Sequence, residues 1–411
     1  MTISNLSIQR GYALRNIYEY GGGIFNESGT VAIENSRVTQ CIEEGIRNSD
    51  SMTITATFID NNSGLEIGGI HNTDNSDLKI VNSTIENNSG GILNKYDSSL
   101  RIENSSIIYN YENGGLKQAG PNITPISITN SIISNNQNSE APGGGIGVFN
   151  GDEILIENSV IEGNTGGGIH FYGTVITISN SAINSNLVDG GAGSQGAGIH
   201  MIGGKLILIN SSVTNNQLSP PEGTKGGGIY LEGWSQIENS TISQNTAGTG
   251  GGLYLASGKT TITNTTIFSN VATLGGGIYD QPSVFSPAIL YNSIVANNSG
   301  ENCSGSEITS LGNNIESGNS CQFVNSGDQI NTEPLLDSLA WNGGIGFSHA
   351  PLEGSPAIDN GNNVNCPIMD QRGVSRPYDG NNDSIAICDV GAVEYGPSPL
   401  QHLYLPLTAK P

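Results

Sequence analysis

Apolar and polar residues alternate in short stretches along most of this chain. Two examples are TVITISNSAI at residues 174–183 and GKTTITNTTI at residues 258–267. Alternation with β-branched residues is typical of short strands that bury one face, and the glycines and asparagines between the stretches indicate bends. The pattern therefore predicts an all-β chain built from short strands rather than helices.

The strands recur within a repeated phrase, in which glycines precede an isoleucine or leucine. We call this apolar residue the anchor of a coil. Successive anchors lie 22 to 30 residues apart, and they are Ile24, Ile46, Ile70, Ile92, Leu116, Ile146, Ile169, Ile199, Ile229, Leu253 and Ile278. A unit of this length cannot bury its apolar face alone, but it can when stacked on copies of itself. We therefore predict a parallel β-helix in which the anchors, among them Ile24, Ile70, Ile169, Ile229 and Ile278, stack inside.

A second motif, Asn-Ser/Thr-x-Ile-x-x-Asn, follows most anchors, for example from Asn82 to Asn88. Asparagine suits bends because it tolerates left-handed backbone and bonds neighbouring backbone groups. Amide side chains stacked in register can also bond along the axis of a solenoid. Cys41 occupies one of these asparagine positions, so we expect a buried, reduced cysteine.

These coils resemble the right-handed parallel β-helix proteins of the pectin-lyase-like superfamily, which includes pectate lyases, and the glycine-rich repeats of bacterial surface proteins. The resemblance covers residues 1–300 and implies a right-handed solenoid of about 11–12 coils. It constrains the fold more than the function, because one fold hosts many activities.

The repeat stops after Asn298. Residues 301–395 contain SPAIDNG, DQRG and CDVGAVEY, and they resemble the C-terminal region of secreted bacterial β-helix proteins of the choice-of-anchor kind. This resemblance implies an irregular cap that keeps the last strands from pairing with other chains. Residues 396–411 form a Pro-rich tail that we expect to be mobile, and its LPLTA lacks the hydrophobic segment that follows a sortase signal.

Four of the five cysteines fall in this last quarter. Three connectivities are open to them, and we predict the two local pairings, Cys303 with Cys321 and Cys366 with Cys388. Disulfides imply an oxidising compartment, so we expect an extracellular or cell-surface protein. The chain opens within a repeat, at MTISNLSIQRG, so we interpret Met1 as a truncated start and draw nothing from a missing signal peptide.

The charge balance excludes some partners. The formal net charge is −23, with only 14 Lys and Arg residues. A nucleic acid or an anionic membrane is therefore a disfavoured partner. No apolar run is long enough to span a bilayer.

The sequence predicts no catalytic residues. The NTD at residues 72–74 matches the first motif of polygalacturonases, but their other motifs are not in place on the following coils. Pectate lyases hold calcium with carboxylates, and Asp60 and Glu86 could stack one coil apart, either as a calcium pair or as a solvated acidic face. Calcium is thus the one cofactor to consider, and a His170/His200 metal site lacks a third ligand.

One column of residues exceeds the background. The residue after each anchor should point outward because the anchor points inward. On the last five coils these residues are His170, His200, Tyr230, Tyr254 and Tyr279. Exposed rings in a row would form a ligand-binding platform for sugars, whereas the alternative is an aromatic stack that only stabilises neighbouring strands. Near pH 5 we expect His170 and His200 to become charged and repel one another.

Insertions point to the same side of the coils. Residues 137–143, 187–196 and 217–226 all lengthen the corner that leads into the anchors, and insertions on one side often mark the working face of a solenoid.

Three functions remain open. We favour a secreted or cell-surface protein that acts without catalysis in adhesion or polysaccharide binding. The alternatives are a polysaccharide lyase or glycoside hydrolase, and a structural stalk of a larger surface protein. An enzyme should show a carboxylate cluster beside Arg, Lys or His, a binding protein should show exposed aromatic rings, and a stalk should show neither.

Overall fold

The computed structural model describes residues 1–12, 22–120, 124–138, 142–150, 153–282 and 287–396. Within these ranges the chain is almost entirely strand and turn, and the one helical element is a 3₁₀ turn at Asn363–Asn365. The chain forms a parallel β-solenoid of about 11 turns, as predicted. It divides into two compact units, the first comprising Met1–Thr177 with Asn186–Val188, and the second comprising the rest.

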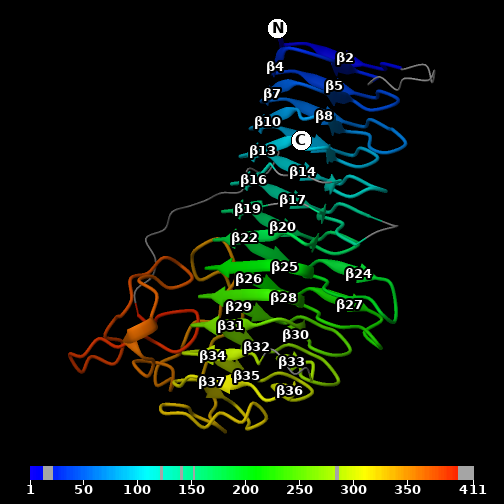
Figure 1. Cartoon of the computed structure of the whole chain (residues 1–411). Coiled ribbons are helices and arrows are strands. Elements are labelled where there is room, and N and C mark those ends of the chain that lie inside the picture. Colours follow the sequence, from blue (N-terminus) through cyan, green and yellow to red (C-terminus); the bar gives the residue numbers. More distant parts are fainter. Residues whose placement is uncertain (13–21, 121–123, 139–141, 151–152, 283–286, 397–411) are drawn as a thin grey trace. The chain divides into compact units, whose positions relative to one another are not determined.

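Each coil of the first unit contains three strands. One coil consists of β9 (Ile70–Asn72), β10 (Asp77–Val81) and β11 (Thr84–Glu86), and it pairs in parallel with β12 (Ile92–Lys95), β13 (Ser99–Glu103) and β14 (Ser106–Ile108) of the next. The coils succeed one another from blue to green in Figure 1. The remaining strands up to β22 are β1 (Thr2–Ser4), β2 (Ser7–Gln9), β3 (Ile24–Asn26), β4 (Thr30–Glu34), β5 (Arg37–Thr39), β6 (Ile46–Asn48), β7 (Ser51–Thr55), β8 (Phe58–Asp60), β15 (Leu116–Ala119), β16 (Ile126–Thr129), β17 (Ile132–Ser134), β18 (Ile146–Phe149), β19 (Glu153–Glu157), β20 (Val160–Glu162), β21 (Ile169–Tyr172) and β22 (Val175–Ser179).

The second unit repeats this arrangement with longer strands at its start. Its strands pair in parallel register, as β25 and β28 do over residues 199–209 and 229–238. The strands are β23 (Ala182–Asn184), β24 (Leu187–Asp189), β25 (Ile199–Ile209), β26 (Ser212–Thr214), β27 (Gln217–Ser219), β28 (Ile229–Glu238), β29 (Thr241–Ser243), β30 (Leu253–Ser257), β31 (Thr260–Thr263), β32 (Thr266–Phe268), β33 (Ile278–Asp280), β34 (Ile289–Tyr291), β35 (Ile294–Ala296), β36 (Cys303–Gly305), β37 (Thr309–Ser310) and β38 (Ile315–Glu316).

The anchors behave as predicted. Every one of the eleven begins a strand, and we call these the anchor strands: β3, β6, β9, β12, β15, β18, β21, β25, β28, β30 and β33. Their isoleucines and leucines are buried and lie opposite the anchor of the neighbouring coil, as Ile70 lies opposite Ile92 and Ile229 opposite Leu253. The solenoid core is therefore a set of apolar columns along the coil axis.

The two asparagines of the repeat have different roles. The first takes left-handed backbone at the bend before the third strand, as at Asn82, where φ is 48°. The second is buried and forms an amide ladder, in which the side chain of Asn88 donates to that of Asn110 at 3.0 Å, and Asn110 donates to Asn136 at 2.9 Å. Each amide also donates to a backbone carbonyl, so the buried polar groups of this column are satisfied.

Cys41 takes its expected place in this ladder. It is buried and free, and its backbone N–H donates to the side chain of Asn62 at 2.9 Å. Burial raises the pKa of its thiol, so this cysteine is a packing residue rather than a reactive one.

A second amide ladder was not predicted. It runs along the anchor strands from Asn26 through Asn48, Asn72 and Asn94 to Gln118, with links of 2.6 to 2.8 Å. Asn72 opens the NTD that matches a polygalacturonase motif, yet its side chain is fully buried in this ladder. Its place in the sequence therefore has a structural explanation.

The C-terminal region contains both predicted disulfides, Cys303–Cys321 and Cys366–Cys388. Strands β36, β37 and β38 add a further coil, which extends the parallel pairing to residue 316. The division at residues 300 and 395 stays a prediction, and the tail lies outside the described residues apart from Gly396.

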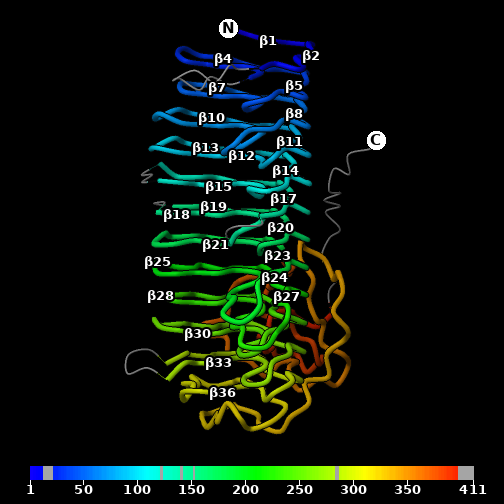
Figure 2. Tube along the Cα trace, turned by 90° about the vertical axis from the view of Figure 1, so that its right-hand side faces the viewer, coloured from blue at the N-terminus to red at the C-terminus, as the bar shows by residue number. Residues whose placement is uncertain are grey.

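The rest of the C-terminal region packs along the side of the second unit, beside β29, β32 and β35 (Figure 2). Three hydrogen bonds from these coils hold it there. The Oγ1 of Thr241 donates to Gln371 at 2.5 Å, the N–H of Ala392 donates to Thr266 at 3.0 Å, and Ser243 contacts the Nε2 of His349 at 2.9 Å. The sequence did not predict this lateral contact.

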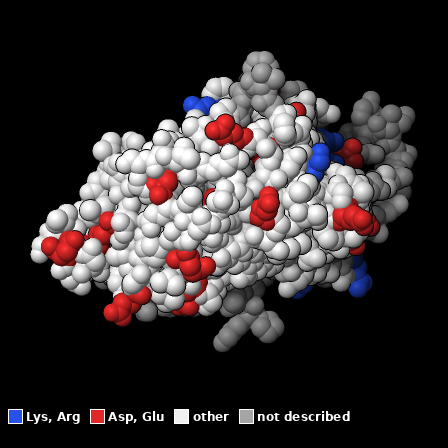
Figure 3. Space-filling view, turned by 90° about the horizontal axis from the view of Figure 1, so that it is seen from below, with Lys and Arg blue, Asp and Glu red and all other residues white. Residues whose placement is uncertain are grey.

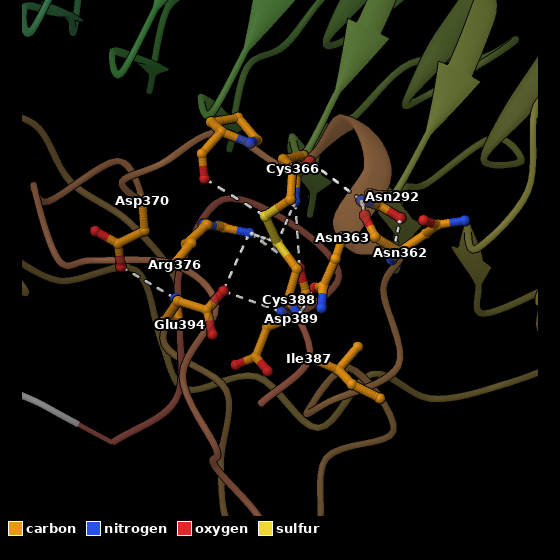
Figure 4. Close-up of a disulfide and its surroundings, with 12 residues drawn as sticks. Asn292, Asn362, Asn363, Cys366, Asp370, Arg376, Ile387, Cys388, Asp389 and Glu394 are labelled. Atoms are coloured by element: carbon orange, nitrogen blue, oxygen red, sulfur yellow. Dashed lines mark hydrogen bonds and ion pairs between the residues drawn. A yellow bond between two sulfur atoms is a disulfide. The ribbon is translucent and has the colours of Figure 1, made fainter. Parts of the chain in front are cut away.

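Figure 4 shows the buried centre of this region, around the Cys366–Cys388 disulfide. Arg376 is buried and lies 3.4 Å from the carboxylate of Glu394. Burial raises the pKa of Asp389 to about 7 and that of Glu394 to about 8, so the carboxyls are hard to ionise and Arg376 is their counter-charge. The arrangement fixes the fold of the C-terminal region onto the coils.

Candidate functional site

The aromatic column is in register but is not exposed. In the second unit His200, Tyr230, Tyr254 and Tyr279 occupy matching positions on β25, β28, β30 and β33. The ring centroids of Tyr230 and Tyr254 lie 5.3 Å apart at an angle of 10°, and those of Tyr254 and Tyr279 lie 5.1 Å apart at 19°. Yet Tyr254 is only 3% exposed and Tyr230 only 7%. The expected exposure of this column is therefore wrong.

Neighbouring groups explain the burial. The rings of Tyr230 and Tyr279 cover the two faces of Tyr254, and the Nζ of Lys225, from the loop before β28, lies 5.0 Å from its centroid. Its hydroxyl donates to Gln281 at 2.6 Å. A sugar ring cannot stack on an aromatic face that another ring covers, so this column acts as a structural stack.

His170 belongs to the first unit and is also buried. Its ring centroid lies 5.2 Å from that of Phe149, at an angle of 43°. Burial lowers its pKa from 6.5 to about 4. His170 is therefore neutral at pH 5, and the expected charging of this histidine is wrong because desolvation disfavours the imidazolium.

Exposed rings do occur on the first unit, two residues farther along the anchor strands. Tyr172 is 49% exposed, and Phe149 lies beside it in register on the preceding coil. Tyr96, which directly follows β12, is 54% exposed. We missed these rings because only the residue after each anchor was considered. The signal was an aromatic residue at the third position after two successive anchors.

A cluster of charged side chains lies on the same face of the first unit. Arg47 and His71 follow the anchors of β6 and β9 and are adjacent in register. The Nδ1 of His71 lies 2.7 Å from Oε1 of Glu44, and a guanidinium nitrogen of Arg47 lies 3.6 Å from the same oxygen. Because Glu44 is a hydrogen-bond acceptor, it fixes the proton of the imidazole on Nδ1.

A second ion pair flanks this cluster. The Nζ of Lys95 lies 2.5 Å from Oε2 of Glu66. Hydrogen bonding to Lys95 lowers the pKa of Glu66, and the charges of His71 and Arg47 lower it further, which places Glu66 near both. Lys117 lies one coil beyond β12 on the same side of the anchor strands. Basic residues thus gather here, whereas acidic side chains lie scattered over the face shown in Figure 3.

The signal for Glu44 was present in the sequence. Two residues before the anchor, nine coils have glycine and one has alanine, and only the coil of Ile46 has glutamate. Glu43 and Glu44 have φ values of 64° and 74°, in the left-handed region that favours glycine. The break in the glycine phrase at EEG was the departure to notice.

The Asp60/Glu86 pair is adjacent in register, as expected. Arg37 donates two hydrogen bonds of 2.7 Å to Asp60. Burial alone would raise the pKa of Asp60, but the hydrogen bonds from Arg37, Asn61 and Thr39 outweigh it and lower the pKa. This partner already neutralises the charge that a calcium ion would need, so the pair is poorly suited to hold calcium.

Within the described ranges, one group of side chains has metal-site spacing: Cys366, Cys388 and Glu394. Its two sulfurs form a disulfide and offer no thiolate, so this group cannot act as a zinc site. In the same ranges no helix has the length and apolar character needed to cross a membrane.

Comparison with known families matches residues 68–236 and 116–279 to the right handed beta helix region family. Together the matches cover more than half of the chain, which therefore belongs to that family. Among solved structures the chain is similar to one titled "Crystal structure of pectate lyase Pel9A", with 15% identity and a TM-score of 0.40 over 95% of this chain and 88% of that one. No curated protein matches the sequence.

Proposed function

We propose that this protein is an extracellular or cell-surface β-helix that binds a polysaccharide, without catalysis, along the outer side of the anchor strands of its first unit. The observation that carries the proposal is the pair formed by Phe149 and Tyr172, which lie one coil apart in register with Tyr172 half exposed. Rings about 4.8 Å apart offer a flat apolar strip on which a sugar ring can stack.

The surroundings suit a glycan chain. Lys95 occupies the same position on β12 that Phe149 and Tyr172 occupy on β18 and β21, the third residue after the anchor. Lys117 and Arg47 add positive charge on this side of an otherwise acidic protein. Basic residues beside aromatic rings favour an acidic polysaccharide over a neutral one. The two disulfides support an oxidising, extracellular location.

Affinity electrophoresis or calorimetry with polygalacturonate, alginate, xylan and glucomannan tests the proposal. Tyr172→Ala should weaken binding by about 1–2 kcal/mol, a loss in affinity of roughly five- to thirtyfold. Tyr109→Ala is the matched control, because Tyr109 is 54% exposed but follows β14 on another side of the coil. Equal binding by both variants and the wild type would refute the role of Tyr172.

The charged cluster supports a second candidate, a polysaccharide lyase or glycoside hydrolase. A carboxylate, an imidazole and a guanidinium lie together in Glu44, His71 and Arg47, a combination used in acid–base catalysis. Assays for unsaturated uronate products and for reducing ends on the same polysaccharides decide between binding and catalysis. If the protein neither binds nor cleaves any of them, the stalk hypothesis takes their place.

A further inference from the structure

The coil of Ile46 keeps an unfavourable residue at a glycine position. Glu44 adopts left-handed backbone with φ at 74°, as Gly90 does at the same position with φ at 96°. A non-glycine residue in this region is strained, and Glu43 beside it is in the same conformation. Such strain persists where the surrounding structure imposes it, and it is concentrated at functional sites.

The side chains of Glu44 and His71 are buried but incompletely bonded. Glu44 is 9% exposed and His71 is 4% exposed. One oxygen of Glu44 contacts the Nδ1 of His71, but the other oxygen, Oε2, has no hydrogen-bond partner, and neither has Nε2 of His71. Leaving such atoms unbonded is costly, so a native structure that retains them calls for an explanation.

The two unpaired atoms define the missing partner. With its proton on Nδ1, a neutral His71 presents Nε2 as an acceptor, and Oε2 of an ionised Glu44 is also an acceptor. A ligand must therefore bring two donors on neighbouring atoms, as two adjacent hydroxyl groups of a sugar ring do. Arg47 contributes further N–H donors at the edge, for an oxygen of the same ligand.

The groups above this pair can move aside. The side chain of Arg47 is 20% exposed, and the Lys95–Glu66 pair has exposures of 19% and 54%. A salt bridge at this exposure contributes little to stability, so opening it costs little. Access to the buried pair thus requires only side-chain movement.

We propose that Glu44 and His71 form a recessed subsite that binds adjacent hydroxyl groups of one sugar residue, with Arg47 at its rim. The ligand class rests on the proposed function, because Lys95 links this subsite to the strip formed by Phe149 and Tyr172. The backbone strain at Glu44 is then retained for binding and not for stability.

A double variant, Glu44→Gly with His71→Leu, tests the subsite in the full chain. Glycine is the residue that the other coils use at this position, and leucine is the residue of the next coil at the position of His71. The double variant removes the strain together with both unpaired atoms. We expect its melting temperature to equal or exceed that of the wild type, and its affinity for the bound polysaccharide to fall about tenfold or more.

Glu44→Gln is the second variant, for the case in which the double variant folds poorly. It keeps the shape and can still accept from His71, but it places an N–H donor where the ligand needs an acceptor. Loss of affinity with an unchanged melting temperature supports the subsite. Unchanged affinity in either folded variant overturns it, and shows instead a structural pair or one bridged by water.

Binding by the wild type and by Tyr172→Ala separates the two proposals. If the wild type binds polygalacturonate or another member of the panel, Tyr172→Ala weakens that binding and the Glu44 and His71 variants do not, the proposed function stands and the subsite fails. If the wild type binds none of the four polysaccharides, both fail.

Discussion

The burial of His170 predicts a measurable pH dependence of stability. Its pKa is about 4 in the folded protein, against an ordinary value of 6.5. A depressed pKa means that the unfolded chain takes up the proton first as the pH falls. The stabilising contribution of neutral His170 is therefore present above pH 6.5 and is lost progressively below it, down to about pH 4.

The magnitude follows from the size of the shift. Each pKa unit corresponds to about 1.36 kcal/mol, so the full loss below pH 4 is about 3.4 kcal/mol. At pH 5 the unfolded chain is almost fully protonated at this residue while the folded protein is mostly neutral. The loss there, relative to pH 7.5, is about 2 kcal/mol.

His170→Leu removes this titration and keeps an apolar side chain beside Phe149. Denaturant unfolding at pH 7.5 and pH 5.0 gives the free energy of unfolding of each protein. We expect the wild type to lose about 2 kcal/mol more than the variant between these values. Other titrating groups, including His349, whose pKa is also lowered by burial, contribute equally to both proteins and cancel.

The same variant assigns the His170 signal in an NMR titration of labelled histidine rings. Equal losses of stability in the two proteins, or a His170 ring that titrates above pH 6, would show that this imidazole is hydrated. The account of a dry outer face on this coil would then fail.

Two further predictions concern the stacks. Tyr254→Ala should destabilise the protein by about 3–5 kcal/mol, as expected for a buried ring, and leave polysaccharide binding unchanged; denaturant unfolding and the binding assay above check both. Asn110→Ala should cost about 1–3 kcal/mol, because it leaves Asn88 without its acceptor and the carbonyl of Ile85 without its donor; a change below 0.5 kcal/mol would show that the ladder contributes little.

The fold could be predicted because its information is repeated. The same burial requirement recurs at Ile24 and at Ile278, so one irregular coil does not obscure the pattern. The two disulfides were accessible because their cysteines lie 18 and 22 residues apart, outside the repeat. The lateral packing of the C-terminal region was not accessible, because polar contacts such as Thr241 with Gln371 leave no periodic signal.

The candidate site could not be predicted by the same means, because a site is where the repeat is broken. The column of Tyr230, Tyr254 and Tyr279 drew attention since it is regular, and regularity turned out to serve packing. Exposure depends on what covers a position, and the loop that carries Lys225 over Tyr254 is not periodic. The informative residue was Glu44, which stands where other coils have glycine and keeps an unpaired carboxylate oxygen. In a repeat protein, uniform positions therefore indicate the fold, and a costly exception among them is the better indicator of function.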